Sequence, residues 1–176
     1  MVLETPQRTE VAPLPALSTL RLALASGALM VPIGLLAAAA DAAVLAPPLG
    51  VTAFAGLAAP GAESNRPRNV ILGHGLGVAL GMAALWVSGA ARMVPALPQA
   101  FELRHVLSAT LAVTLTAAAT GLARTPHPPA LATTLIFALG LLRTPADGLA
   151  LMVGAGVVAG SLAVLRRRSG GVAARA

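Results

Sequence analysis

Residues 70–90 read VILGHGLGVALGMAALWVSGA, a run that contains no Asp, Glu, Lys or Arg. A helix needs about 20 predominantly apolar residues to cross the hydrocarbon core of a bilayer, and this stretch is long enough and apolar enough to do so. His74 lies about one turn into the run, where a free charge is costly and a bonding partner is expected. The stretch therefore indicates a transmembrane helix.

The composition of the whole chain supports this interpretation. Hydrophobic residues make up 57% of the 176 residues, charged residues only 10%, and the mean hydropathy is +0.84. Soluble domains carry about 45–50% apolar and about 25% charged residues, which excludes a soluble fold. The net charge of +6 comes entirely from arginines at the edges of apolar stretches, which indicates membrane topology and not nucleic-acid binding. The absence of cysteine excludes thiol catalysis and thiolate metal sites.

Four stretches are long enough to span a bilayer, and two are shorter. The long ones are residues 20–40, 70–90, 103–123 and 148–165, and the short ones are 44–58 and 128–142. Each short stretch has a Pro-Pro pair at its beginning, and proline suits the first helical turn because its missing N–H would be unpaired there. Fifteen helical residues reach only about 22 Å, against a core of about 30 Å. We expect an all-α, polytopic transmembrane helix bundle with four long spans and two half-helices.

The same order of elements occurs twice in the chain. A shift of 81 positions superposes Pro47 and Pro48 on Pro128 and Pro129, Thr52 on Thr133, and Gly73 and Gly75 on Gly154 and Gly156. This predicts two repeats, at about residues 20–90 and 101–166. If each short element crosses the membrane, the repeats are inverted and the chain crosses six times. If each short element re-enters, the repeats are parallel and the chain crosses four times, and the sequence leaves both arrangements open.

The two ends of the chain are predicted to be cytoplasmic tails around a membrane domain at residues 18–166. Residues 1–17 contain acidic residues and prolines before the first apolar run, unlike the basic start of a signal peptide, and are expected to be flexible. Residues 167–176 are expected to form a basic tail. Both topologies place the Arg166–Arg168 cluster in the cytoplasm, in a plasma membrane of the bacterial type.

Two glycine stripes indicate close helix packing. Gly73, Gly77, Gly81 and Gly89 follow a four-residue spacing in the second long span, and Gly156 and Gly160 repeat it in the last one. Small residues let helix backbones approach closely in lipid, where packing holds helices together. The stripes are interpreted as contacts inside the bundle, and a homo-oligomer contact is the alternative.

The surroundings of the second Pro-Pro pair suggest a binding site. His127 directly precedes the pair, Arg124 lies just before it, and Thr133 and Thr134 lie about one turn inside the short helix. A helix start presents free N–H groups and the positive end of the dipole, which favour anions. Paired broken helices at matching repeat positions also point to a transporter's binding site. The alternative is that His127 and Arg124 only cap the neighbouring helix and face interfacial water.

Other polar residues near the spans complete the set of candidates. Arg68 and Asn69 precede the second long span, and His74 lies inside it, where it either contributes to the site or bonds within the bundle. Asp41, at the end of the first span, is expected in headgroup water, and an ion pair with an arginine is the alternative. Asp147 is expected to begin the last long helix.

Three ordered motifs resemble the HPP family of integral membrane proteins, which is named for a His-Pro-Pro motif. Residues 124–133, RTPHPPALAT, look like its Arg-Thr-x-His-Pro-Pro-x-Gly-Ala-Thr pattern. Residues 67–74, PRNVILGH, resemble a second signature, and residues 49–53, LGVTA, resemble a third, Phe-Gly-Ala-Ser-Ala. The resemblance covers residues 18–166. It implies four transmembrane helices and, from plastid and cyanobacterial members, nitrite transport, with motif positions at Arg68, Asn69, His74, His127 and Thr133.

The chain departs from these patterns at three positions. Leu131 stands where the family pattern has glycine, and Val51 and Thr52 stand where it has alanine and serine. Bulk at Leu131, beside the half-helix start, is expected to narrow the site.

These observations lead us to expect a transporter or channel for a small inorganic anion such as nitrite, within the lipid bilayer. The candidate binding residues are Thr52, Arg68, Asn69, His74, Arg124, His127, Thr133 and Thr134. No cofactor or metal is expected, because the three histidines lack metal-ligand spacing. An enzyme is disfavoured because the six carboxylates lie mostly in tails or loops. The rival is a structural or assembly membrane protein, in which substituting His127 or Arg68 would alter little beyond stability.

Overall fold

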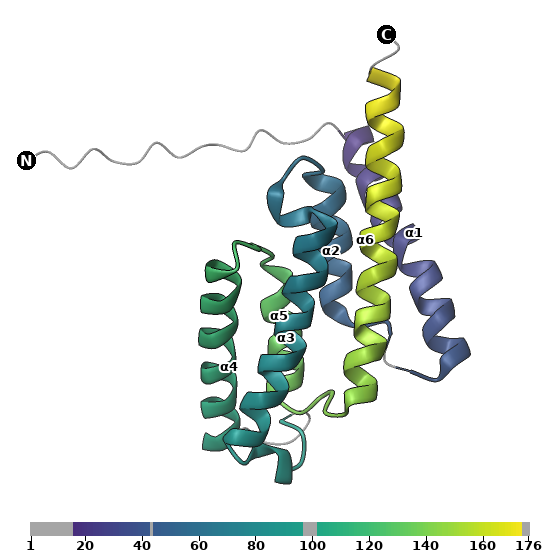
Figure 1. Cartoon of the computed structure of the whole chain (residues 1–176). Helices are drawn as coiled ribbons and strands as arrows, with labels where there is room; N and C mark the ends of the chain where they lie inside the picture. The colour runs from purple at the N-terminus through teal and green to yellow at the C-terminus, as the bar shows by residue number, and fades with distance from the viewer. Residues whose placement is uncertain (1–15, 43, 97–101, 174–176) are drawn as a thin grey trace, which may run out of the picture.

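The computed structural model describes residues 16–42, 44–96 and 102–173, and this part of the chain is helical without strands (Figure 1). Its helices are α1 (Ala16–Ala40), α2 (Pro47–Ala58), α3 (Pro67–Val87), α4 (Leu103–Leu122), α5 (Pro129–Ala138) and α6 (Pro145–Ala173). Short 3-10 turns at Glu63–Asn65 and Ala90–Arg92 flank α3. The predicted tail at residues 1–17 lies outside the described residues up to residue 15, and Ala16 already begins α1.

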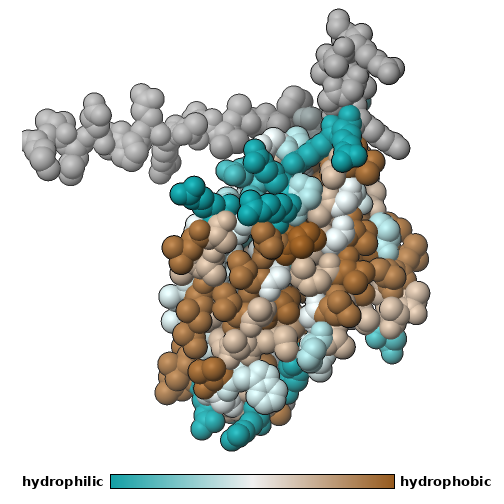
Figure 2. Space-filling view, in the orientation of Figure 1, coloured by the Kyte–Doolittle hydropathy of each residue, from teal (hydrophilic) through white to brown (hydrophobic). Residues whose placement is uncertain are grey.

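Four of these helices, α1, α3, α4 and α6, are long and apolar enough to cross a membrane. Large apolar side chains face outward on them, including Leu35, Trp86 and, at 86% exposure, Leu122. Figure 2 shows a broad hydrophobic belt between hydrophilic ends of the molecule. Such a surface suits lipid and not water. The predicted transmembrane bundle with four long spans and two short helices is confirmed.

The two short helices begin where the Pro-Pro pairs stand. α2 begins at Pro47, and α5 begins at Pro129 with Pro128 as its N-cap. They contain 12 and 10 residues, which corresponds to about 18 and 15 Å. α5 is shorter than the predicted range of 128–142 because the chain turns at Gly140, which has φ of +71°.

α6 is longer than the predicted range of 148–165. Thr144 Oγ1 accepts from the Asp147 N–H at 3.1 Å, and Asp147 Oδ2 accepts from the Thr144 N–H at 2.9 Å. This capping box confirms that Asp147 belongs to the helix start, where it lies in the first turn of α6 after Pro145. The helix continues to Ala173 through the arginine cluster, since arginine is a good helix former. The predicted basic tail is therefore helical as far as Ala173.

Successive helices run in opposite directions along the bundle (Figure 1). The start of α2 lies beside the end of α5, where Ala46 packs with Phe137. The end of α2 lies beside the end of α6, where Gly56 contacts Leu162. The units α1–α3 and α4–α6 thus contain three helices each, and the second is inverted relative to the first. These helix directions are those of the inverted arrangement, one of the two that the sequence left open.

The third helix of each repeat packs on the first two helices of the other. α3, the third helix of the first repeat, packs on α4 and α5. α6, the third helix of the second repeat, packs on α1 and α2. A Cβ on Gly73 would lie 3.3 Å from Ala130 Cβ, and one on Gly154 would lie 2.5 Å from Leu49 Cδ1. Gly154 and Leu49 are the counterparts of Gly73 and Ala130 at the 81-residue shift. Such reciprocal contacts are expected of units related by two-fold symmetry, and they support the predicted duplication.

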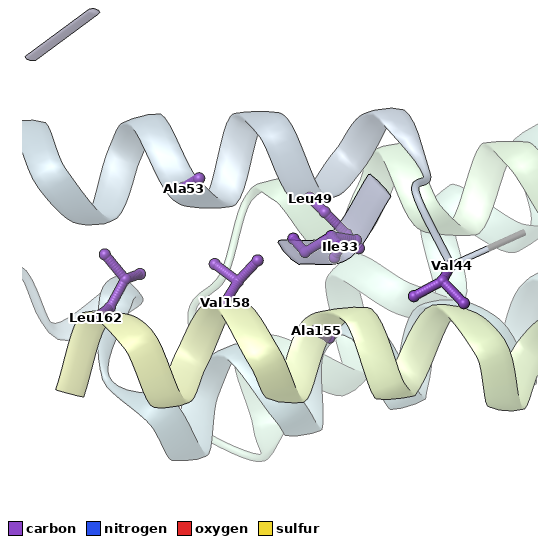
Figure 3. Packing of buried hydrophobic residues seen from close by; sticks show 7 residues of the cluster. All are labelled: Ile33, Val44, Leu49, Ala53, Ala155, Val158 and Leu162. Carbon is purple, nitrogen blue, oxygen red and sulfur yellow. The ribbon is translucent and has the colours of Figure 1, made fainter. Parts of the chain in front are cut away.

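The two equivalent interfaces are filled differently. Between α2 and α6 lies an aliphatic cluster, shown in Figure 3, of Ile33, Val44, Leu49, Ala53, Ala155, Val158 and Leu162. Between α5 and α3 the large side chain is Phe137, which contacts Gly81, whereas at the equivalent place Leu162 contacts Gly56. A large residue therefore meets a glycine at both positions, but the two repeats supply them in the opposite order.

The glycine stripe of α3 packs inside the bundle. A Cβ on Gly77 would lie 2.7 Å from the Ala130 carbonyl oxygen, and one on Gly81 would lie 2.6 Å from that of Thr134. These backbone contacts leave no room for a side chain. An added Cβ on Gly156 or Gly160 of α6 would meet no atom of the described chain within 4 Å. The internal-packing interpretation thus holds for the contacts of α3, and the stripe of α6 faces outward.

Candidate functional site

His74 lies between the two repeats, on α3, and is fully buried. Its Nδ1 lies 2.7 Å from Thr133 Oγ1 of α5, and its Nε2 lies 3.0 Å from Thr52 Oγ1 of α2. The Thr52 hydroxyl also donates to the Pro48 carbonyl at 3.0 Å. Thr52 and Thr133 are counterparts at the 81-residue shift. The imidazole therefore bridges equivalent positions of the two short helices.

His127 brings a second imidazole to the same place from the loop before α5. Its Nε2 lies 3.2 Å from His74 Nε2 and 3.3 Å from Thr52 Oγ1, and its Nδ1 lies 2.8 Å from the Ser64 carbonyl oxygen. The two rings meet edge to face, with centroids 4.9 Å apart. Thr52, His74, His127 and Thr133 thus form one buried polar cluster, which we call the histidine cluster.

The acceptors of the histidine cluster fix its hydrogen positions. The Ser64 carbonyl can only accept, so His127 Nδ1 carries a hydrogen and, in the neutral ring, His127 Nε2 does not. His74 Nε2 then donates toward His127 Nε2, and His74 Nδ1 accepts from the Thr133 hydroxyl. In the neutral pair, every ring nitrogen has a partner of the matching type.

A glycine allows the two histidines to approach. A Cβ on Gly73 would lie 2.8 Å from His127 Cβ, a distance at which two carbon atoms overlap. The loop that carries His127 therefore packs directly on the backbone of α3, and this contact sets the depth of its ring.

The first backbone N–H groups of α5 are already used. Ala130 N–H donates to the His127 carbonyl at 2.9 Å, and Leu131 N–H donates to the Pro128 carbonyl at 3.1 Å. The free N–H groups expected at this helix start are therefore bonded within the turn. What remains for a ligand is the positive end of the dipole and the neighbouring side chains.

A cavity of about 260 Å³ opens between α4 and α5, beside His127. Its lining is mostly apolar and consists of Ala117, Thr120, Gly121, Pro126, His127, Pro128, Ala130 and Leu131. Thr125, two residues before His127, is fully buried, and its hydroxyl has no hydrogen-bond partner among the described residues. A buried polar group of this kind usually pairs with water or a ligand.

The structure does not bring the predicted arginines into the histidine cluster. Arg124 is exposed at the end of α4 with φ of +51°, and Arg68 is exposed in the first turn of α3. Within the described ranges, neither guanidinium has a hydrogen bond or ion pair with the cluster. Both lie at the end of the bundle from which His127 enters.

Two other predicted residues make contacts next to the cluster. Asn69 is buried, and its side-chain amide donates to the Glu63 carbonyl at 2.9 Å, which holds the turn before α3. Thr134 is also buried, and its hydroxyl bonds to Thr116 of α4 and to the Ala130 carbonyl at 3.1 and 3.0 Å. Both stabilise elements that carry the cluster.

The sequence interpretation missed the turn at Glu63–Asn65, which supplies the acceptor for His127. Ser64 contributes its carbonyl, and because every residue has one, the residue type gives no signal. The side-chain amide of the adjacent Asn65 donates to the Ala55 and Ala59 carbonyls at 2.8 and 3.0 Å, and Arg166 donates to the Asn65 carbonyl at 2.9 Å. The turn is thus fastened to the ends of α2 and α6.

Among the described residues, no three His, Cys, Asp or Glu side chains lie close enough together to hold a metal ion. The histidine cluster offers two imidazoles and two hydroxyls, a set that suits hydrogen bonding.

The chain matches a known protein family. The family model described as "HPP, transmembrane region" matches residues 12–166, which is most of the chain and includes the whole histidine cluster. No curated protein and no solved structure matches.

Proposed function

We propose that this chain, which belongs to the HPP transmembrane family, is a membrane transporter or channel for a small inorganic anion such as nitrite. The family and the four candidate spans make it an integral membrane protein. The observation that carries the anion proposal is the histidine cluster, which is buried between two inverted repeats at the start of a half-helix. Transporters built from inverted repeats commonly bind their substrates at such a place.

The chemistry of the cluster suits an oxyanion. Imidazole N–H and hydroxyl groups donate hydrogen bonds to negatively charged oxygens, and these four side chains include no carboxylate that would attract a cation. The α5 dipole adds positive potential at His127. The exposed Arg68 and Arg124 lie at the same end of the bundle and would raise the local concentration of anions there.

The position of His74 also supports alternating access. Its ring is carried by α3 of the first repeat and bonds to Thr133 and His127 of the second. Rocking of one repeat against the other would part these groups and expose them to one side of the membrane and then to the other.

The distribution of arginines supports a cytoplasmic location for the end of α6. Seven of the described arginines lie at that end of the bundle, namely Arg21, Arg66, Arg68, Arg124, Arg166, Arg167 and Arg168, whereas Arg92, Arg104 and Arg143 lie at the other. Figure 2 shows the larger hydrophilic group of residues at the same end. By the positive-inside rule this end faces the cytoplasm, here across a bacterial-type plasma membrane.

The test is nitrite uptake into proteoliposomes that contain the purified chain, against protein-free liposomes. We expect His74→Gln and His127→Gln to lower uptake about tenfold or more, because a buried hydrogen bond to a charged group contributes about 1.5–3 kcal/mol. His105→Gln is the matched control. It alters an equally buried histidine that lies in α4, where its Nε2 bonds to the Val94 carbonyl at 3.2 Å.

The alternative is a structural or assembly membrane protein. One observation favours it, because the neutral histidine cluster satisfies its own hydrogen bonds and would rigidify the contact between the repeats. The absence of uptake of nitrite, nitrate, chloride and formate above protein-free liposomes would support this alternative. We do not propose an enzyme, since two neutral imidazoles and two threonines without a carboxylate give no oriented acid and base pair.

A further inference from the structure

The neutral histidine pair has no hydrogen to spare for an anion. The hydrogen on His74 Nε2 is shared between Thr52 Oγ1 and His127 Nε2, and the others are directed to the Ser64 carbonyl and, from Thr133, to His74 Nδ1. An oxyanion that entered the cluster in this state would face the lone pair of His127 Nε2. It would have to displace an existing hydrogen bond without gaining a free donor.

One added proton reverses this situation. A hydronium ion gives up one proton, so that one O–H bond breaks, one N–H bond forms at His127 Nε2, a water molecule is released and the pair gains one positive charge. Two N–H groups then meet across a distance of 3.2 Å that fits only one hydrogen, and both compete for Thr52 Oγ1, which lies 3.0 and 3.3 Å from the two nitrogens. The two N–H groups repel each other, and an anionic oxygen that accepts from both would relieve the repulsion.

We infer that the His74–His127 pair binds one proton together with each anion, so that transport is proton-coupled and, for a monovalent anion, electroneutral. This inference rests on the proposed function and names the coupling ion. Proton and anion binding are then linked reciprocally, since each raises the affinity for the other. The bound proton and anion also cancel in charge, which lowers the cost of carrying them through a low-dielectric bundle.

The surroundings of the pair leave it free to take up this charge. The groups that face it are uncharged: the Thr52 hydroxyl from α2, the Thr133 hydroxyl from α5 and the Ser64 carbonyl from the turn before α3. α4 contributes Ala117, Thr120 and Gly121 to the cavity beside His127.

The charged residues of neighbouring elements do not contact the pair. Glu63 and Arg66 are exposed and pair with each other at 3.8 Å. On α6, which packs on α3, Asp147 bonds to the start of its own helix, and Arg166 bonds to the Asn65 carbonyl. Among the described residues, no carboxylate or guanidinium therefore contacts either ring, and the pair itself is the group that can change charge.

The cavity beside His127 supports the same conclusion. Its lining is mostly alanine, proline, glycine and leucine, which would favour a neutral proton and anion pair over a bare anion. His127 is part of this lining and also contacts His74, so a proton that arrives through the cavity reaches the pair directly.

The test measures nitrite uptake and internal pH together in proteoliposomes, with the membrane potential clamped by potassium and valinomycin. We expect an inward proton gradient to accelerate uptake, the lumen to acidify by one proton per nitrite, and the membrane potential to have no effect. Protein-free liposomes correct for the diffusion of nitrous acid through lipid.

The outcomes separate this inference from the proposed function. Uptake that is driven by membrane potential and indifferent to the proton gradient would overturn coupling and leave the anion transporter standing. The absence of all anion uptake would overturn both. His127→Gln keeps a hydrogen-bonding side chain that binds no proton, and it should abolish acceleration by the gradient, whereas His105→Gln should keep it. If His127→Gln does not fold, the proton-to-nitrite ratio of the unaltered chain still decides.

Discussion

Gly73 directly precedes His74, and its missing side chain makes room for His127. In Gly73→Ala the new Cβ would lie 2.8 Å from His127 Cβ. Alanine gains about 1 kcal/mol in helix propensity, but overpacking costs about 1–3 kcal/mol. The cost should win because the clash involves Cβ and not the end of a flexible side chain. We expect a net loss of about 1 kcal/mol in unfolding free energy and a clear loss of uptake.

Thermal unfolding in detergent and nitrite uptake check this prediction. Gly27→Ala in α1 is the control, because a Cβ there meets nothing within 4 Å. It should keep uptake and match or exceed the stability of the unaltered chain. If Gly73→Ala behaved in the same way, the close contact between α3 and His127 would have no importance for the site.

Leu131 lines the cavity beside His127, at the position where the family pattern has glycine. Leu131→Gly should widen the cavity and raise nitrite uptake several-fold. The helix should lose about 1 kcal/mol of stability. Leu135→Gly, at a partly exposed position of the same helix outside this cavity, pays the same propensity cost and should not raise uptake. Equal rates in the two variants would show that Leu131 does not restrict access.

The sequence predicted the members of the histidine cluster better than its surroundings. Thr52, His74, His127 and Thr133 were marked by motifs and by the repeat, and the structure brings them together. Arg124 was expected beside them because it is near in sequence, but α4 ends in a turn that directs the chain past it. The roles of all eight candidates in binding stay predictions. A backbone acceptor such as the Ser64 carbonyl has no signature in residue type.

At the scale of elements, the turn at Glu63–Asn65 links the end of α2 to the histidine cluster. Asn65→Ala would remove two hydrogen bonds to the last carbonyls around α2 and loosen the turn that orients His127. Leaving such buried groups unpaired costs about 1–3 kcal/mol. We expect lower stability together with reduced uptake.

Asp147→Ala separates a loss of stability from a loss of function. It removes the capping box of α6 at the opposite end of the bundle, which should cost about 0.5–2 kcal/mol. Uptake, normalised to folded protein, should fall in Asn65→Ala and be retained in Asp147→Ala. Equal uptake in both variants would mean that the turn only stabilises the fold.

The starts of the elements were predictable and their ends less so. The Pro-Pro pairs give the first turns of α2 and α5 because proline fits only there. The end of α5 depends on Gly140, which lies inside an apolar run that reads equally well as helix. The end of α6 depends on whether the arginines after the apolar run continue the helix or lie beyond its end. Hydropathy does not distinguish these outcomes.

At the scale of the whole molecule, the repeat was visible in the sequence. The packing of the third helix of each repeat against the first two helices of the other repeat was not. Hydropathy is the same whether α6 packs on α2 or on α5. This packing between the repeats becomes visible only in paired contacts of the structure, such as Gly73 with Ala130 and Gly154 with Leu49. Because each repeat completes the other, the histidine cluster cannot form within one repeat alone.

The inverted arrangement makes a direct prediction about sidedness. Because the chain has no cysteine, single cysteines report accessibility without removal of native thiols. Asp41 and Gly61 are exposed at opposite ends of α2, and Arg124 and Leu141 lie at opposite ends of α5. If both short helices complete a crossing, an impermeant maleimide added to intact cells should label Asp41→Cys and Leu141→Cys. Gly61→Cys and Arg124→Cys should react only after the membrane is opened.

This pattern bears on mechanism as well as topology. Labelling of Asp41→Cys and Gly61→Cys from the same side would mean that α2 does not complete a crossing, which would remove the basis for rocking between halves inverted across the membrane. Labelling from opposite sides would place Thr52 and Thr133 on two antiparallel helices related by an axis in the membrane plane. His74, which bonds to both hydroxyls, would then lie close to that axis. A group so placed can be reached from either side of the membrane after a small rotation of one repeat relative to the other, as the joint transport of proton and anion through the pair requires.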